Sequence, residues 1–193
     1  MLIVIKKNIA IIIDFLIVMP KLTKKWSEER YNSYFDNFKS EYGYIFSDKK
    51  IEVACKDNFI LYYYKQNNTF AIFDVYTNNI AGVFFTYEFS FDEILENTNG
   101  ILVDLPVIVK QYQGKKLALW VYKEIHKFFK LPIVASNNQT ESILYSVWFK
   151  LGKEKKVTAK RGYSCECVYN WNESCINITH KKNSTEWYLI YED

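Results

Sequence analysis

The sequence predicts an α+β protein with a mixed, mostly antiparallel central sheet and flanking helices. Residues 51–89 alternate aromatic or β-branched stretches with Asn-rich turns, which is typical of antiparallel strands. Residues 101–109 and 131–135 are apolar runs on either side of an amphipathic helical pattern, which indicates a parallel strand–helix–strand unit. After residue 157 the chain again has the pattern of short strands, so helices and strands do not simply alternate.

The composition suits one domain with a sizeable core. The chain has 193 residues, of which 49% are hydrophobic, and a formal net charge of +3. A charge this small does not by itself indicate a nucleic-acid partner.

The N-terminal segment, residues 1–45, is expected to pack as a strand and a helix on a domain formed by residues 46–193. Ile9–Met19 is an apolar run interrupted by a charge, and it is shorter than the roughly 20 residues of a membrane helix. We therefore expect no membrane association and a cytoplasmic location. An export signal stays open, as does an upstream extension that ends before a functional start at Met19. Residues 27–40 carry aromatic side chains at helical spacing.

The elements between residues 51 and 109 follow from turn signals and apolar runs. An Asn-rich triplet marks a hairpin. Pro106 lacks a backbone donor and therefore predicts a bulge or a missing ladder bond in its strand. The predicted elements are strands at 51–65 with a break at 56–58, 70–76, 80–89 and 101–109, turns at 66–68, 77–79 and 99–100, and a short helix at 92–97.

The second half begins with a helix whose apolar stripe is Leu117, Val121, Ile125 and Phe128. Its neighbours are predicted from the same kind of pattern. They are a buried strand at 131–135, a helix that begins at Thr140 and stops at Gly152, and strands at 163–169, 176–180 and 187–191.

Three cysteines and a histidine lie close together near the C-terminus, at Cys165, Cys167, Cys175 and His180. Zinc sites usually pair cysteines at wider spacing than Cys165-x-Cys167. Ordinary thiols on a strand are therefore the favoured interpretation and no metal is expected, while metal binding stays open as the alternative.

Three stretches resemble the GCN5-related N-acetyltransferase (GNAT) superfamily: IVKQYQGKKLA at 108–118, LPIVAS at 131–136 and VWFKLG at 147–152. The likeness is best over residues 70–155 and centres on a motif, Arg/Gln-x-x-Gly-x-Gly/Ala, between a buried strand and a helix. It implies an N-acetyltransferase that uses acetyl-coenzyme A and an amine-bearing acceptor of unknown class. SNNQT at 136–140 is also similar to a phage-encoded GNAT-like subgroup.

Two registers fit the motif. If Gln111 opens it, Lys116 falls on the sixth position, where a small residue is expected. If Gln113 opens it, Ala118 fills the sixth position and Lys116 falls where the family has glycine. We prefer the second register because it makes Leu117 the first core residue of the helix.

The resemblance implies that this turn binds coenzyme A. Free N–H groups at a helix N-terminus bind a pyrophosphate without a dedicated cation, and Lys116 either contacts the phosphate or obstructs the turn. The preceding strand would pair its backbone with the pantetheine arm. An ordinary strand-to-helix turn with solvated lysines is the alternative. The implied cofactor-binding residues are Val107, Ile108, Val109, Gln113, Gly114, Lys115, Lys116, Leu117 and Ala118.

Two residues are candidates for catalysis. Many GNAT proteins carry an acidic Tyr four residues before the glycine that ends the last helix, whereas this chain has Trp148, whose indole N–H is only a donor. Tyr145 lies one turn earlier and is the candidate acid. Asp104, expected on the same strand face as Ile108, is the candidate general base, with a pKa that burial would raise. Packing roles are the alternative for both.

Three functions follow from these patterns. The first is an N-acyltransferase in which an amine attacks the acyl group of coenzyme A directly. The second is a GNAT-like nucleic-acid-modifying enzyme of the Mom type. The third is a degenerate GNAT fold that serves as a binding module, for which Trp148 and Lys116 argue.

Overall fold

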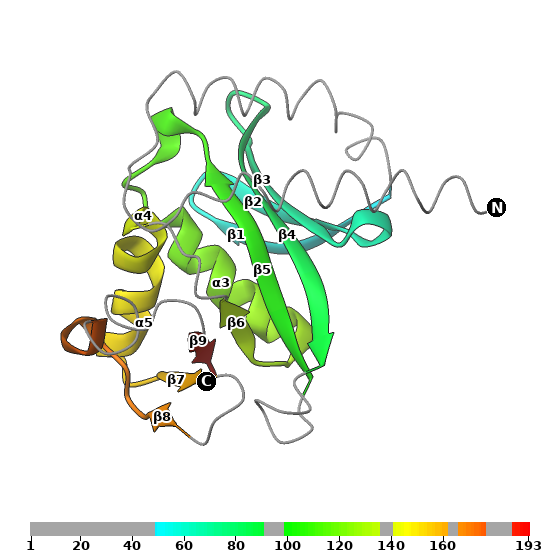
Figure 1. Ribbon diagram of the computed structural model, residues 1–193. Coiled ribbons are helices and arrows are strands. Elements are labelled where there is room, and N and C mark those ends of the chain that lie inside the picture. Colours follow the sequence, from blue (N-terminus) through cyan, green and yellow to red (C-terminus); the bar gives the residue numbers. More distant parts are fainter. Residues whose placement is uncertain (1–48, 91–98, 136–140, 162–165, 177–186) are drawn as a thin grey trace, which may run out of the picture.

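The computed structural model describes residues 49–90, 99–135, 141–161, 166–176 and 187–193 (Figure 1). They form an α+β fold on a mixed, mostly antiparallel sheet, as the sequence predicts. The N-terminal segment, the helix at 27–40 and the short helix at 92–97 lie outside the described residues, so those predictions stay predictions.

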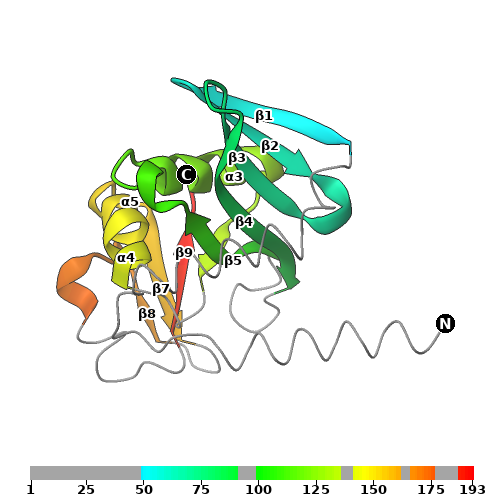
Figure 2. The same cartoon turned by 90° about the horizontal axis from the view of Figure 1, so that it is seen from above.

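The nine strands of the described sheet are ordered β1-β2-β3-β4-β5-β6-β9-β7-β8. β5 and β6 are parallel and every other neighbouring pair is antiparallel, which confirms the strand–helix–strand unit. Seen from above, β1–β4 lie on one side of β5, and β7–β9 lie on the other side with α4 and α5 (Figure 2). The strands are β1 (Lys50–Lys56), β2 (Phe59–Tyr64), β3 (Thr69–Asp74), β4 (Asn79–Ser90), β5 (Asn99–Ile108), β6 (Ile133–Ala135), β7 (Val157–Arg161), β8 (Cys167–Val168) and β9 (Trp187–Tyr191).

Of the two predicted helices in the described residues, the second is less regular than the sequence predicts. The helix expected to stop at Gly152 continues to Lys153 and contains a π-helical segment in its middle. The described helices are η2 (Lys65–Asn67), η3 (Lys110–Tyr112), α3 (Leu117–Phe129), α4 (Glu141–Ile143), the π-helix η4 (Leu144–Trp148), α5 (Phe149–Lys153) and η5 (Glu173–Cys175).

Two further predictions are wrong. Asn99 and Gly100 begin β5 rather than forming a turn, because both pair with the end of β4. In the predicted strand 163–169, the described part contains only the two residues of β8, and β7 was not assigned as a separate strand from the sequence.

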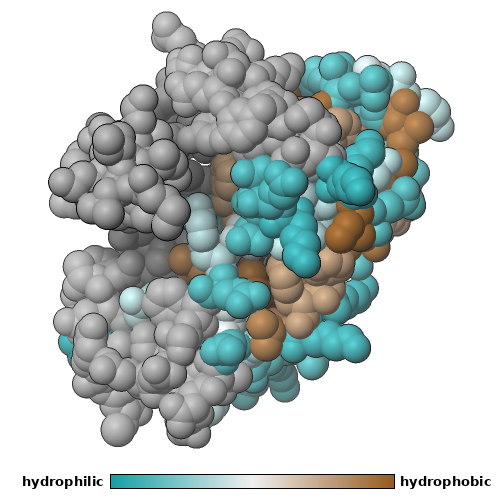
Figure 3. All heavy atoms as spheres, turned by 90° about the vertical axis from the view of Figure 1, so that its right-hand side faces the viewer, coloured by the Kyte–Doolittle hydropathy of each residue, from teal (hydrophilic) through white to brown (hydrophobic). Residues whose placement is uncertain are grey.

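One large core lies between the sheet and the helices α3, η4 and α5. Leu117, Val121 and Ile125 are buried in it, as the apolar stripe predicts, whereas Phe128 is 37% exposed. On the side of the molecule shown in Figure 3, hydrophobic atoms form a small patch bordered by hydrophilic ones, as on most protein surfaces.

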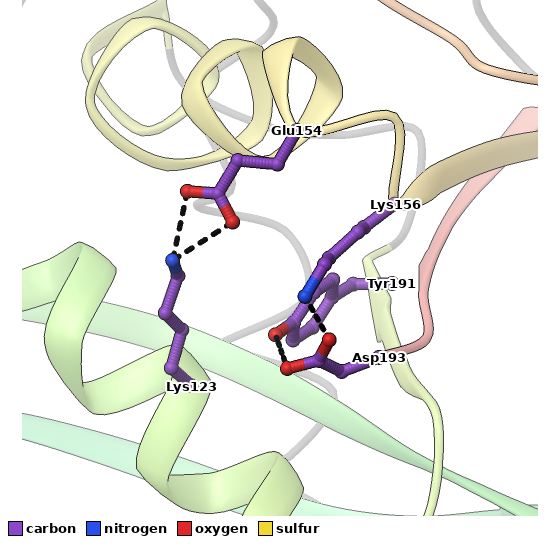
Figure 4. Close-up of polar contacts among 5 residues, drawn as sticks. All are labelled: Lys123, Glu154, Lys156, Tyr191 and Asp193. Atoms are coloured by element: carbon purple, nitrogen blue, oxygen red, sulfur yellow. Dashed lines mark hydrogen bonds and ion pairs between the residues drawn. The ribbon is translucent and has the colours of Figure 1, made fainter.

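Exposed polar contacts join α3 to the end of α5, and the C-terminus to the residue that precedes β7 (Figure 4). Lys123 Nζ of α3 donates to both carboxylate oxygens of Glu154, at 2.8 and 2.9 Å. Lys156 pairs with Asp193, and Tyr191 Oη donates to the same carboxylate at 3.4 Å. Exposed ion pairs of this kind contribute about 0–1 kcal/mol each to the free energy of unfolding, so their effect on the stability of the fold is small.

β5 contains the bulge that Pro106 predicts. Val83 of β4 pairs with Val107, whereas Phe85 pairs with Asp104, so β5 has one more residue than β4 over this interval. An extra residue turns the following side chains to the opposite face of the sheet.

The bulge overturns the expected alignment of Asp104 with Ile108. Ile108 belongs to the large core under α3. Asp104 lies opposite Phe85, whose ring packs on a smaller cluster around Tyr64 and Val83. The two residues therefore face opposite sides of the sheet, because the spacing argument assumed an unbroken strand.

Candidate functional site

The parallel strands β5 and β6 pair over a very short stretch. The pairs are Ile101 with Ile133 and Leu102 with Val134. β5 continues to Ile108, whereas β6 ends at Ala135. In the described part of the chain, residues 103–108 therefore extend past the last β5–β6 pair, where the resemblance implies contacts with a pantetheine arm.

The connection from β5 to α3 is a tight turn with two left-handed residues. Gly114 has φ 82° and is exposed, and no other heavy atom lies within 4 Å of the place where its Cβ would be. Lys116, the N-cap of α3, has φ 58° and ψ 24°. This conformation costs a non-glycine residue about 1–2 kcal/mol and is the one that glycine adopts readily. Lys116 therefore has a glycine-like backbone at the position where the preferred register expects glycine.

The N-terminus of α3 presents unpaired backbone donors. The first helical bond runs from Trp120 N to Lys116 O at 3.1 Å, and no side chain caps the helix. The N–H groups of Leu117, Ala118 and Leu119 precede that bond and have no intrahelical acceptor. With the positive end of the helix dipole behind them, they favour an anionic ligand.

The polar side chains of the turn differ in their roles. Gln113 Nε2 donates to Ile108 O at 3.0 Å and so ties the turn to the end of β5. Lys115 Nζ lies over the rings of Phe59 and Tyr112, 5.3 and 5.6 Å from their centroids. Lys116 has an exposed side chain, so it is the lysine of the pair that is not held on an aromatic ring.

A buried carboxylate lies next to this turn. Asp74, at the end of β3, is 5% exposed. Its Oδ1 accepts from Asn58 Nδ2 at 2.6 Å and from the backbone N–H of Tyr76 at 3.1 Å. Its Oδ2 accepts from the hydroxyls of Thr77 and Tyr112, at 3.0 and 3.1 Å. No local pattern indicates this cluster, because its donors come from two turns and a short helix.

These hydrogen bonds make the stability of the fold depend on pH. Burial raises the pKa of Asp74, but the four donors outweigh burial and hold it below its usual 3.8. Because the pKa is lower in the folded state, the ionised carboxylate stabilises the fold fully above about pH 5, and this contribution is lost as the pH falls through 3.8 towards the folded pKa.

We expect Asp74→Asn to flatten the fall in the melting midpoint between about pH 5 and pH 2.5, since the charge that titrates is gone. Thermal melts across this range measure the slope. Asp57→Asn, at an exposed left-handed turn residue where Asn is tolerated, is the control and should keep the wild-type slope. Equal slopes for wild type and Asp74→Asn would contradict the assignment.

The candidate catalytic residues lie on different elements. Tyr145 is 54% exposed on η4, and its ring packs edge-on against Phe149. Asp104 is half-buried on β5. Its charge, after burial itself, is the second cause that raises the pKa of Tyr122 on α3. The Asp104 carboxylate therefore acts electrostatically on Tyr122.

Tyr122 and Trp148 form a buried polar pair that the sequence did not identify. Both are fully buried, and their rings meet edge-on with centroids 5.7 Å apart. Within the described residues, the Tyr122 hydroxyl and the Trp148 indole nitrogen have no hydrogen-bond partner. The helical pattern of residues 117–128 accounts for Tyr122 by packing alone, so its hydroxyl has no separate signal in the sequence.

The described residues offer no metal site. Within them, no group of three His, Cys, Asp or Glu side chains is arranged to hold an ion. Cys167 and Cys175 are partly buried, while Cys165 and His180 lie outside the described residues. Among the helices of the described ranges, none has the length and apolar character needed to cross a membrane.

No model of a known protein family matches the chain, and a search of curated proteins finds no match.

Proposed function

We propose that this protein is an acetyl-coenzyme A-dependent N-acetyltransferase in which an amine attacks the thioester directly. The observation that carries the proposal is the N-terminus of α3. Lys116 has the backbone conformation of the expected glycine there, and it precedes three uncapped N–H groups, of Leu117, Ala118 and Leu119. This turn directly follows a strand that extends past its parallel partner.

The residues present fit coenzyme A. The uncapped N–H groups suit its pyrophosphate, and the Lys116 ammonium adds positive charge nearby. The backbone of 103–108 suits its pantetheine arm, since amide groups on an open strand edge pair with extended amides. Coenzyme A itself supplies the activated acyl thioester, and positioning it beside an amine provides much of the rate enhancement.

Asp104 is the proposed acceptor for the proton of the attacking amine. It lies on β5, within the stretch beyond the last β5–β6 pair. A carboxylate is suited to this role because it accepts a proton from an attacking amine directly or through one water molecule. In this proposal Tyr145, an exposed residue of η4, is the acid that protonates the departing thiolate of coenzyme A.

A degenerate GNAT-like binding module is the second candidate, favoured by Trp148 at the position of the acidic Tyr. Calorimetry with acetyl-coenzyme A, followed by thiol release with a panel of amines, separates the two. Binding with transfer supports the enzyme, binding without transfer supports a module that retains coenzyme A, and no binding at millimolar ligand rules out the enzyme but not a module with another ligand. Titration with duplex DNA at two salt concentrations tests a nucleic-acid acceptor, since phosphate contacts weaken steeply with salt.

Lys116→Gly is expected to keep or improve the affinity for coenzyme A, because backbone N–H groups carry the binding in this proposal. Removing the left-handed strain should also raise the free energy of unfolding by up to about 1 kcal/mol. Lys130→Gly is the matched control, because Lys130 is a left-handed lysine at the other end of the same helix, with φ 55°. Calorimetry and thermal melts of both variants measure the two effects.

The pair of variants separates strain from ligand contact. Both should be stabilised alike, and Lys130→Gly should bind as wild type does. A loss of about tenfold or more in Lys116→Gly alone, equal to about 1.4 kcal/mol, would show that the ammonium holds the phosphate.

A further inference from the structure

One buried hydroxyl group, that of Tyr112, links the turn before α3 to the β3–β4 hairpin. Tyr112, the last residue of η3, is 4% exposed, and its ring meets Phe59 edge-on with centroids 5.7 Å apart. Its hydroxyl lies 3.1 Å from Asp74 Oδ2 and 3.0 Å from Thr77 Oγ1. Tyr112 immediately precedes Gln113, so this hydroxyl joins the candidate phosphate turn to the β3–β4 hairpin.

All the acceptor positions of the Asp74 carboxylate are used. Asn58 and the N–H of Tyr76 occupy one oxygen, and the hydroxyls of Thr77 and Tyr112 occupy the other. Three of these donors belong to the β1–β2 and β3–β4 turns, which are held by the sheet itself. Tyr112 alone reaches the carboxylate from the segment that leads into α3.

We propose that Asp74, acting through the Tyr112 hydroxyl, is a positioning residue that holds the turn Gln113–Lys116 in its ligand-ready conformation. The proposal rests on the function proposed above. A turn with two left-handed residues has other conformations available, and a buried charge-assisted hydrogen bond at its base restricts them. A turn held in advance binds more tightly because less freedom is lost on binding.

Tyr112→Phe and Thr77→Val test this as a matched pair. Each removes one hydroxyl donor from the same carboxylate oxygen and leaves a side chain of similar shape, buried at position 112 and exposed at position 77. Only Tyr112→Phe cuts the connection to the turn. Hydrogen–deuterium exchange of the peptide spanning 110–120, in protein without ligand, reports the order of the turn directly. Calorimetry with coenzyme A reports the consequence for binding.

We expect exchange in this peptide to be about threefold or more faster in Tyr112→Phe than in Thr77→Val. Coenzyme A should bind about fivefold or more weakly to Tyr112→Phe and within about twofold of wild type to Thr77→Val. Equal exchange in the two variants, or no change in either, would overturn the positioning role. If the turn loosens only in Tyr112→Phe while wild type fails to bind coenzyme A, the positioning role stands and the proposed function fails.

Discussion

Gly152→Ala is expected to lower the free energy of unfolding by about 2 kcal/mol, although alanine is the better helix former. A Cβ at this position would lie 2.4 Å from the carbonyl oxygen of Trp171. Overpacking costs about 1–3 kcal/mol and sometimes more, while the gain in helix propensity is about 1 kcal/mol. For a chain of this length the melting midpoint should fall by about 4–8 °C.

The backbone of Trp171 has little room to move away from a new methyl group. Its N–H donates to Val157 O at 2.7 Å, and its fully buried ring stacks on Phe149 with centroids 5.2 Å apart. Lys153→Ala, at the exposed next residue of the same helix, is the control and should change stability by no more than about 0.5 kcal/mol. If Gly152→Ala were as stable as wild type, the close approach to Trp171 would be wrong.

Gly152 also shows where sequence patterns were informative and where they were not. Local signals were reliable: the Asn-rich triplet gave the β3–β4 hairpin, and the stripe of Leu117, Val121 and Ile125 gave α3. The glycine was interpreted as a helix stop because glycine commonly has that role. The reason for a glycine at this position is instead the close approach of the Trp171 carbonyl, a contact between distant segments that no local pattern contains.

The same distinction applies to the sheet. Strands joined by short turns were predicted with their partners, whereas β9 lies between β6 and β7, which no spacing indicates. Pro106 correctly predicted the bulge in β5. The change of face at Ile108 was missed, because the spacing argument assumed that side chains alternate between the two faces without a break through the bulge.

The candidate site was predicted in part. The location of the turn between β5 and α3 was predicted correctly. The preferred register stays a prediction, although Lys116 has the left-handed conformation of a glycine. The residues that support the turn were not found. Tyr112 and Tyr122 are two of 16 tyrosines, and composition alone gives no reason to choose them. Asp74 is an acid at the end of a strand, and its four donors come from three separate segments.

Trp148→Ala is expected to lower the free energy of unfolding by about 3–5 kcal/mol, a large part of the 5–15 kcal/mol typical of a domain. Trp148 is fully buried in the large core, and its ring packs edge-on against Tyr122. Trp148→Phe should cost only about 1 kcal/mol or less, because it keeps an aromatic ring and removes an indole N–H that has no acceptor. Chemical denaturation of both variants measures the difference.

A third variant connects this packing residue to the proposed chemistry. Trp148→Tyr places an acidic hydroxyl where the indole donates but cannot supply a proton at neutral pH. If this position faces the departing thiolate, as the resemblance implies, release of free thiol from acetyl-coenzyme A in the presence of an amine should rise by about tenfold or more over Trp148→Phe, since a positioned acid contributes about 10²–10⁴-fold. Similar rates in the two variants, at similar stability, would make Trp148 a core residue alone and leave the unpartnered indole N–H without a catalytic meaning.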